Sequence, residues 1–269
     1  MQITVLISGS GSNLLALLDA QSLGLLKGTI TQVISSNESA YGLQRAAAAG
    51  VPTKTHVLRK YYKGTTKDQK DARAARREHF NKDLANLLIH GNVAGTPDNA
   101  YTKPDLVVCA GWMLILSPTL LVPLEKSCMS IINLHPALPG AFDGTHAIDR
   151  AWQAGKDGLI TKGGVMIHHV IAEVDRGEPV LVKEIDLRNE ETLEQYEERV
   201  HAVEHKAIVE GTNIVLSELI AAREGMEKAE KAETSKTEKT ASEKLETPVA
   251  PRSEKGVLEA TMEKLKLRQ

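Results

Sequence analysis

The chain has 269 residues, of which 42% are hydrophobic and 25% charged, enough for one large α/β domain or two small ones. Its formal net charge is -2, so no basic field favours a nucleic acid as partner. No apolar run approaches the length of about 18 residues that a membrane-spanning helix needs. We therefore expect neither nucleic-acid nor membrane binding. Two cysteines, Cys109 and Cys128, are too few for a disulfide framework, which suits a cytoplasmic protein.

Strand-like apolar runs alternate with helix-like segments over residues 1–222, which predicts an α/β fold with a mostly parallel sheet covered by helices. The predicted strands are residues 3–7, 30–34, 106–109, 130–133, 163–170 and 179–186. The last two are expected to pair antiparallel across a turn near residues 175–177, and a further strand follows Pro52. The predicted helices are residues 14–20, 41–49, 68–89 and an amphipathic segment over 193–219.

The composition changes near residue 223. Residues 224–269 hold acidic and basic side chains in equal numbers, no aromatic residue and few large apolar ones. This is too little apolar surface to bury a core and offset chain entropy. We predict a domain over 1–222 and a tail over 223–269 that is disordered or transiently helical. Residues 257–267 have helical spacing and could dock weakly on a partner.

A glycine-rich segment, Ser8-Gly9-Ser10-Gly11-Ser12-Asn13, lies between the first predicted strand and a helix. Glycines let backbone amides approach an anion closely, and a helix N-terminus adds partial positive charge. Leu14 stands where a dinucleotide-binding fingerprint has glycine, and no Gly-Lys-Ser/Thr follows as in a Walker loop. The segment predicts a site for a phosphate monoester. The alternative is a tight turn in which Ser or Asn caps the helix.

Asn133 and His135 follow a predicted central strand, at the sheet edge where α/β proteins bind ligands. An amide donor can stabilise an oxyanion and an imidazole can move protons, so this pair is suited to acyl transfer. Asp175 follows the strand over 163–170, and a carboxylate beside an imidazole raises its pKa. One alternative is a structural histidine. Another is a metal site formed by His135, His146, His168, His169 and Asp175, but the spacing is not that of a zinc module.

Two further segments are candidates for ligand contact. His201 and Glu204 are three residues apart on the last predicted helix, so they share one face that is either solvated or directed at a polar ligand. The apolar segment 111–116, GWMLIL, is either core or the wall of a pocket for a flat, apolar ligand.

Taken together, the chain resembles the phosphoribosylglycinamide formyltransferases, also called glycinamide ribonucleotide transformylases, of the fungal type. The segments that carry the resemblance, within residues 1–220, are VLISGSGSNL, PDLVVCAGWMLILSP, INLHPALPGAFDG, VMIHHVIAEVDRGEPV and EETLEQYEERVHAVEHKAIVEG. The resemblance implies a Rossmann-like, mostly parallel seven-stranded sheet. It also implies formyl transfer from 10-formyltetrahydrofolate to the amine of N1-(5-phospho-D-ribosyl)glycinamide in purine biosynthesis, without a metal and with small molecules as its partners.

The resemblance also assigns site residues. Catalysis falls to Asn133, His135 and Asp175: Asn133 donates to the oxyanion, His135 stabilises it and moves protons, and Asp175 raises the pKa of His135. The ribonucleotide contacts are Gly11, Ser12, Asn13, His201 and Glu204. The folate contacts are Arg77, Met113, Leu114, Ile115, Leu116, Asn133, Ile171, Ala172, Glu173, Val174 and Asp175. Many bacterial relatives carry arginine where Leu114 stands, so that charged contact is absent here or made elsewhere.

Two other functions remain open. One is another folate-dependent formyl enzyme, either a formyltetrahydrofolate hydrolase or a formyltransferase acting on aminoacyl-tRNA or a sugar nucleotide. These share the Asn, His and Asp residues, but the phosphate loop and Glu204 argue against them. The other is a nucleotide-binding scaffold without catalysis, with the tail as its interaction element.

Overall fold

In the computed structural model, the backbone is described for residues 1–98 and 100–245, and the side chains for 1–98 and 100–231. The contacts divide the chain into two units, Met1–Ile220 and Ala221–Gln269. All the predicted strands and all the candidate site residues lie in the first unit.

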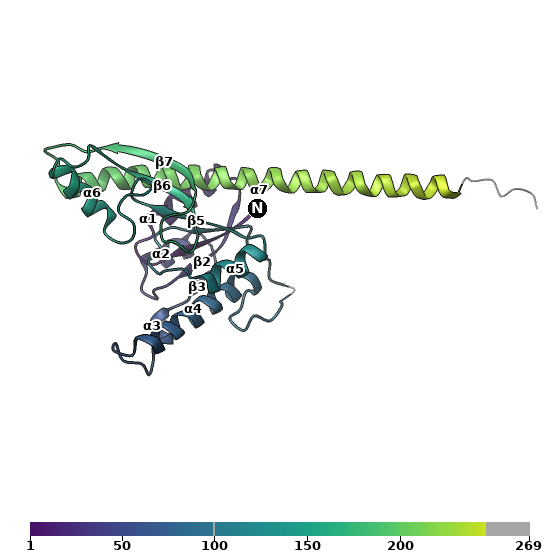
Figure 1. The fold of residues 1–269 in the computed structure, drawn as a ribbon, viewed down its shortest axis with the longest axis horizontal. Coiled ribbons are helices and arrows are strands. Elements are labelled where there is room, and N and C mark those ends of the chain that lie inside the picture. Colours follow the sequence, from purple (N-terminus) through teal and green to yellow (C-terminus); the bar gives the residue numbers. More distant parts are fainter. Residues whose placement is uncertain (99, 246–269) are drawn as a thin grey trace, which may run out of the picture. The chain divides into compact units, whose positions relative to one another are not determined.

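The first unit is built on one seven-stranded sheet with the order β3-β2-β1-β4-β5-β6-β7 (Figure 1). The strands are β1 (Gln2–Ile7), β2 (Thr29–Ser35), β3 (Thr53–Thr55), β4 (Leu106–Cys109), β5 (Ser130–His135), β6 (Lys162–His169) and β7 (Pro179–Asp186). The first five are parallel, whereas β6 runs antiparallel to both β5 and β7. This confirms the mostly parallel seven-stranded sheet. The order reverses between β1 and β4, so the crevice beyond their carboxyl ends is the expected place for a ligand.

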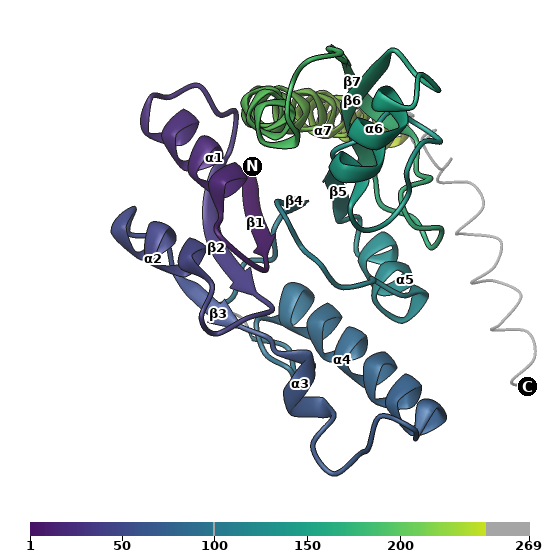
Figure 2. The same cartoon turned by 90° about the vertical axis from the view of Figure 1, so that its left-hand side faces the viewer.

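Helices cover both faces of the sheet (Figure 2). They are α1 (Ser12–Ser22), α2 (Tyr41–Ala48), α3 (Leu58–Tyr61), α4 (Lys70–His90), α5 (Pro118–Lys126), α6 (Ala147–Lys156) and α7 (Leu193–Leu245). Alternate residues of β1 enter different cores: Val5 packs with side chains of α1 and α7, and Leu6 with side chains of α4 and α5. Alternation along a strand buries both faces, which explains why the central strands β1 and β4 are almost entirely apolar.

The predicted strands and the four predicted helices are confirmed; their ends differ by a few residues, except that the last helix, expected over 193–219, continues to Leu245. Three helices were not predicted, namely α3, α5 and α6. The strand expected to end at Asn133 continues to His135, which places Asn133 and His135 on one face of β5.

Helix α7 packs on β6 along its first half. A Cβ atom on Gly211 would lie 2.7 Å from Cγ1 of Ile167, so only glycine lets the helix approach the strand this closely. Residues 223–245 of the expected tail are helical, and residues 246–269, including 257–267, lie outside the described residues. Within the described part of the chain, no helix is both long and apolar enough to cross a membrane.

Candidate active site

The N-terminus of α1 has no side-chain cap. Gly11 is its N-cap residue, with φ of 70°, and no side chain of Ser or Asn hydrogen-bonds to the first amides. The alternative of a turn capped by Ser or Asn is therefore not what the structure shows. A Cβ atom on Gly11 would lie 2.6 Å from Cα of Gly42, which is too close for any side chain. The position therefore requires glycine for two reasons, this steric clash and the positive φ. The leading amides of α1 are left to bind an anion.

Glu204 of α7 lies next to this loop. Its Oε2 accepts hydrogen bonds from Nδ2 of Asn13, at 3.4 Å, and from Nδ1 of His201, at 2.9 Å. Glu204 is only 4% exposed, so this carboxylate does not belong to a solvated helix face, whereas His201 is partly exposed. The hydrogen bond to Glu204 raises the pKa of His201, with burial opposing it and the charge of Glu197 adding to it. A buried carboxylate and an imidazole beside an anion site are suited to bind hydroxyl groups of a sugar phosphate.

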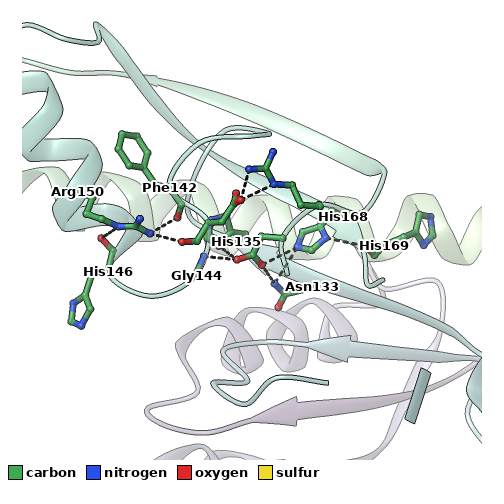
Figure 3. Close-up of polar contacts among 11 residues, drawn as sticks. Asn133, His135, Phe142, Gly144, His146, Arg150, His168 and His169 are labelled. Carbon is green, nitrogen blue, oxygen red and sulfur yellow. Dashed lines mark hydrogen bonds and ion pairs between the residues drawn. The ribbon is translucent and has the colours of Figure 1, made fainter. Parts of the chain in front are cut away.

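Asn133, His135 and Asp175 converge at the end of β5. Oδ2 of Asp175 lies 3.4 Å from Nδ1 of His135 and accepts a hydrogen bond of 2.8 Å from the Gly144 amide. Oδ1 lies 3.4 Å from Nδ2 of Asn133. Figure 3 shows that Asn133, His135 and Gly144 lie close together here. Asp175 has φ of 56°, a conformation that Asp tolerates better than most residues and that is frequent at functional sites.

The pKa values of this pair follow from burial and charge. Burial by itself would raise the pKa of Asp175, but hydrogen bonds from His168 and Gly144, with the charge of His135, lower it below its ordinary value. Burial lowers the pKa of His135, and the Asp175 carboxylate opposes this without outweighing it. Asp175 thus raises the pKa of His135, as expected from the sequence. Burial has the larger effect, however, so the pKa of His135 is lower than its ordinary value. At neutral pH His135 is uncharged, and its Nδ1–H faces Asp175.

His168 completes the cluster; the sequence suggested it only as part of the alternative metal site. It lies opposite Asn133 in the antiparallel pair of β5 and β6. Its Nδ1 lies 2.9 Å from the His169 carbonyl oxygen, and its Nε2 lies 3.2 Å from Nδ2 of Asn133 and 3.5 Å from Oδ1 of Asp175 (Figure 3). The ring is 2% exposed. His168 therefore contacts both Asn133 and Asp175 and limits the positions that their side chains can take.

Two arginines stabilise the loop that carries the Gly144 amide. Nη2 of Arg150 donates to the carbonyls of Phe142, at 2.6 Å, and Asp143, at 2.7 Å (Figure 3). Nη2 of Arg176 lies 2.6 Å from Oδ2 of Asp143. These contacts hold the loop against the turn that contains Asp175. They thereby keep the Gly144 amide in place to donate its hydrogen bond to the Asp175 carboxylate.

The candidate residues surround one cavity of about 440 Å³. Its lining includes Ser12, Asn13, Met113, Leu114, Ile115, Leu116, Asn133, His135, Ile171, Glu173, Val174, Asp175, His201 and Glu204. Met113 and Ile115 are 67% and 52% exposed, so large apolar side chains border the opening. The segment 111–116 is thus a pocket wall as well as core, which suits a flat, apolar ligand.

Three predicted contacts do not line this cavity. Gly11 is buried behind the loop that it shapes. Ala172 lines a neighbouring cavity beside α5. Arg77, on α4, donates from Nε to the hydroxyl of Tyr62 at 3.3 Å. Among the residues that the structure describes, no cluster of His, Cys, Asp or Glu is arranged to hold a metal ion.

Comparison with known proteins agrees with this geometry. The formyl transferase family model matches residues 1–212. The phosphoribosylglycinamide formyltransferase of Saccharomyces cerevisiae is 51% identical over 81% of this chain and 98% of its own length. That of Schizosaccharomyces pombe is 45% identical over 80% of this chain and 97% of its own length.

A solved structure shows the same fold. The crystal structure of glycinamide ribonucleotide transformylase 1 from Symbiobacterium toebii has a TM-score of 0.64 and 30% identity, and the match covers 81% of this chain and 88% of that one. The chain therefore belongs to the formyl transferase family, within the phosphoribosylglycinamide formyltransferases of fungal type.

Proposed function

We propose that the chain transfers the formyl group of 10-formyltetrahydrofolate to the amine of N1-(5-phospho-D-ribosyl)glycinamide, a step of purine biosynthesis, in the cytoplasm. The observation that carries the proposal is one cavity that joins an uncapped helix N-terminus to Asn133, His135 and Asp175. An anion site and an acyl-transfer site that open into the same cavity fit an amine with a phosphate at its far end. No metal takes part in the proposed reaction.

Both substrates have a place in this cavity. The ribonucleotide phosphate binds the amides that follow Gly11, and the ribose lies against Glu204 and His201. The folate ring lies between the wall 113–116 and the loop 171–175, whose apolar side chains border the opening. The amine and the formyl carbon then meet beside Asn133 and His135. The buried Oδ1 of Asn13 has no hydrogen-bond partner within the described residues, so it is left to accept a hydrogen bond from the ribonucleotide.

The reaction needs one new bond, one broken bond and a balanced transfer of protons. The neutral amine nitrogen attacks the formyl carbon, and the carbonyl oxygen becomes negatively charged. Nδ2 of Asn133 donates a hydrogen bond to that oxygen in place of its long contact of 3.4 Å with Oδ1 of Asp175. The amine loses a proton, the bond from carbon to N10 of the folate breaks, and N10 gains a proton. The reaction uses no covalent intermediate with the protein.

His135 is suited to move the proton. Because its Nδ1–H faces Asp175 at 3.4 Å, the lone pair of its neutral ring is on Nε2. That atom is buried and has no hydrogen-bond partner among the described residues. Its lowered pKa keeps the ring neutral and able to accept the proton of the attacking amine. Asp175 then stabilises the imidazolium until the proton passes to N10.

Two substitutions test these roles. We expect His135→Ala and Asn133→Ala each to lower kcat at least about 10²-fold, the scale of a lost proton carrier or oxyanion donor. Calorimetry of His135→Ala with a non-reacting folate should show binding within roughly threefold of wild type, because the cavity wall remains. Lys162→Gln changes an exposed residue that pairs with Glu184 and serves as the matched control. Full turnover in His135→Ala would contradict the proposal and favour the non-catalytic scaffold.

A further inference from the structure

The apolar wall of the cavity belongs to the segment 111–116, which has few contacts with the rest of the backbone. Trp112 and Leu116 are buried and anchor the segment in the core, whereas Met113 between them is exposed. Among the residues that the structure describes, the only hydrogen bond of this segment runs from the Met113 amide to Oγ of Ser8, at 2.9 Å. The position of the exposed part of the wall therefore depends on the hydroxyl of Ser8.

Ser8 is the first residue after β1, at the sheet edge where the cavity lies. Alternation along the strand puts it on the same face as Leu6, which belongs to the same hydrophobic core as Trp112. Its Oγ accepts a second hydrogen bond, of 2.6 Å, from the hydroxyl of Ser36, the first residue after β2. Because β1 lies between β2 and β4 (Figure 2), this one oxygen joins the segments that follow three neighbouring strands. The bond to Met113 spans the point where the strand order reverses.

The loop that precedes α1 has anchors of its own. The carbonyl of Gly9 accepts a hydrogen bond of 3.2 Å from the amide of Gly42. The carbonyl of Ser10 accepts one of 3.0 Å from Nε of Arg45. Both donors lie on α2, so these bonds remain when the hydroxyl of Ser8 is removed. The hydroxyl of Ser8 therefore acts on the wall and leaves the anion site unchanged.

We propose that Ser8 is a positioning residue for the folate: its hydroxyl holds the Met113 amide and so fixes the wall against which the folate ring binds. This rests on the proposed function. A flat ring that lies between the wall and the loop 171–175 needs the two to keep a fixed separation. Ordering a mobile wall at the moment of binding costs free energy, and a wall that is already held avoids that cost. Loss of the hydrogen bond therefore weakens folate binding and leaves the reacting groups in place.

The test compares the two substrates in the full-length enzyme. Ser8→Ala should raise the KM for 10-formyltetrahydrofolate about three- to tenfold, the scale of one neutral hydrogen bond. It should leave kcat and the KM for the ribonucleotide within about twofold of wild type, because the groups that react and the anion site are unchanged. Ser8→Thr keeps a hydroxyl at the same place and should restore most of the loss.

Two further variants show whether the effect passes through Oγ of Ser8. Ser22→Ala is the matched control: it removes an exposed hydroxyl that donates to the Asp19 carbonyl at 2.8 Å, outside the cavity lining, and should change neither KM. Ser36→Ala, added to Ser8→Ala, should raise the folate KM no further, because both contacts use one oxygen. An unchanged folate KM in folded Ser8→Ala, an equal rise in both KM values, or an equal rise in Ser22→Ala would overturn the proposal. So would a further rise in the double variant.

Amide hydrogen exchange tests the contact without turnover. The Met113 amide should exchange about three- to tenfold faster in Ser8→Ala than in wild type, because it loses its acceptor. Failure of the proposed function gives a different result, since wild type would then show no ribonucleotide-dependent turnover. Calorimetry with folic acid would still test the wall, and Ser8→Ala should bind it about three- to tenfold more weakly. Unchanged exchange of the Met113 amide, or unchanged binding of folic acid, would refute the role of Ser8.

Discussion

Asp175→Asn is the most informative single change, because it removes a charge while nearly preserving the shape of the side chain. The carboxylate lies 3.4 Å from Nδ1 of His135, and the two side chains are 9% and 5% exposed. At that distance a full charge pair is worth about 5 kcal/mol at an effective dielectric constant of about 20. The amide retains a dipole and the Gly144 contact, so we expect a loss of roughly 3–4 kcal/mol, or 10²–10³-fold in kcat.

The pH dependence of this variant has a definite sign. In wild type, burial lowers the pKa of His135 and the Asp175 charge opposes that effect. Without the charge, the pKa of His135 falls further. The acid limb of activity, where His135 becomes protonated, should therefore move to lower pH while the plateau above it drops. The substrate amine titrates equally in both enzymes and does not affect this difference.

The measurement is kcat across pH 5 to 8, together with an NMR titration of the His135 ring in both proteins. A higher pKa of His135 in Asp175→Asn would refute the reasoning. So would a kcat within about threefold of wild type in a folded sample.

Three more predictions concern the loop, the fold and the tail. Gly11→Ala should raise the KM for the ribonucleotide at least about tenfold, because φ of 70° and the contact at 2.6 Å both exclude a Cβ. Gly9→Ala, with no atom within 4 Å of its Cβ, should not, and equal effects would contradict the role of Gly11. Glu191→Ala should lower the free energy of unfolding by roughly 2–3 kcal/mol in urea, because it leaves Arg199 without its contacts of 2.6 and 3.0 Å. Activity of the folded fraction should not change, and an unchanged midpoint would refute the prediction. Truncation after Ala222 should leave kcat within roughly twofold of wild type, and a large loss would show that the tail supports the first unit.

The central strands could be predicted because both of their faces are buried. Apolar runs such as residues 106–109 admit few alternatives, and the boundaries of that strand match the structure. Helices α3 and α6 are short. The first has four residues, too few to show a period. The second has an apolar stripe of Ala147, Ile148, Ala151 and Trp152, which is present in the sequence but was not recognised over only ten residues. Helix α5 contains Pro123, which argues against a helix in the sequence alone.

The site was predictable where its residues follow strands. Asn133 and His135 lie at the end of a strand, and this position alone was enough to predict that they take part in the site. His168 could not be assigned, because its contact with Asn133 depends on the register of β5 and β6, which the sequence does not specify. The pKa of His135 could not be predicted either, since the depth of burial decides whether the Asp175 charge prevails.

The most direct test of the central claim is the change in folate absorbance when the full-length protein is mixed with 10-formyltetrahydrofolate, with and without N1-(5-phospho-D-ribosyl)glycinamide. We predict turnover only when the ribonucleotide is present, with one tetrahydrofolate formed for each ribonucleotide consumed. Turnover without the ribonucleotide would contradict the claim and identify a hydrolase. No turnover in a folded sample that binds folate would also contradict the claim, and would favour a protein that binds its ligands without catalysis.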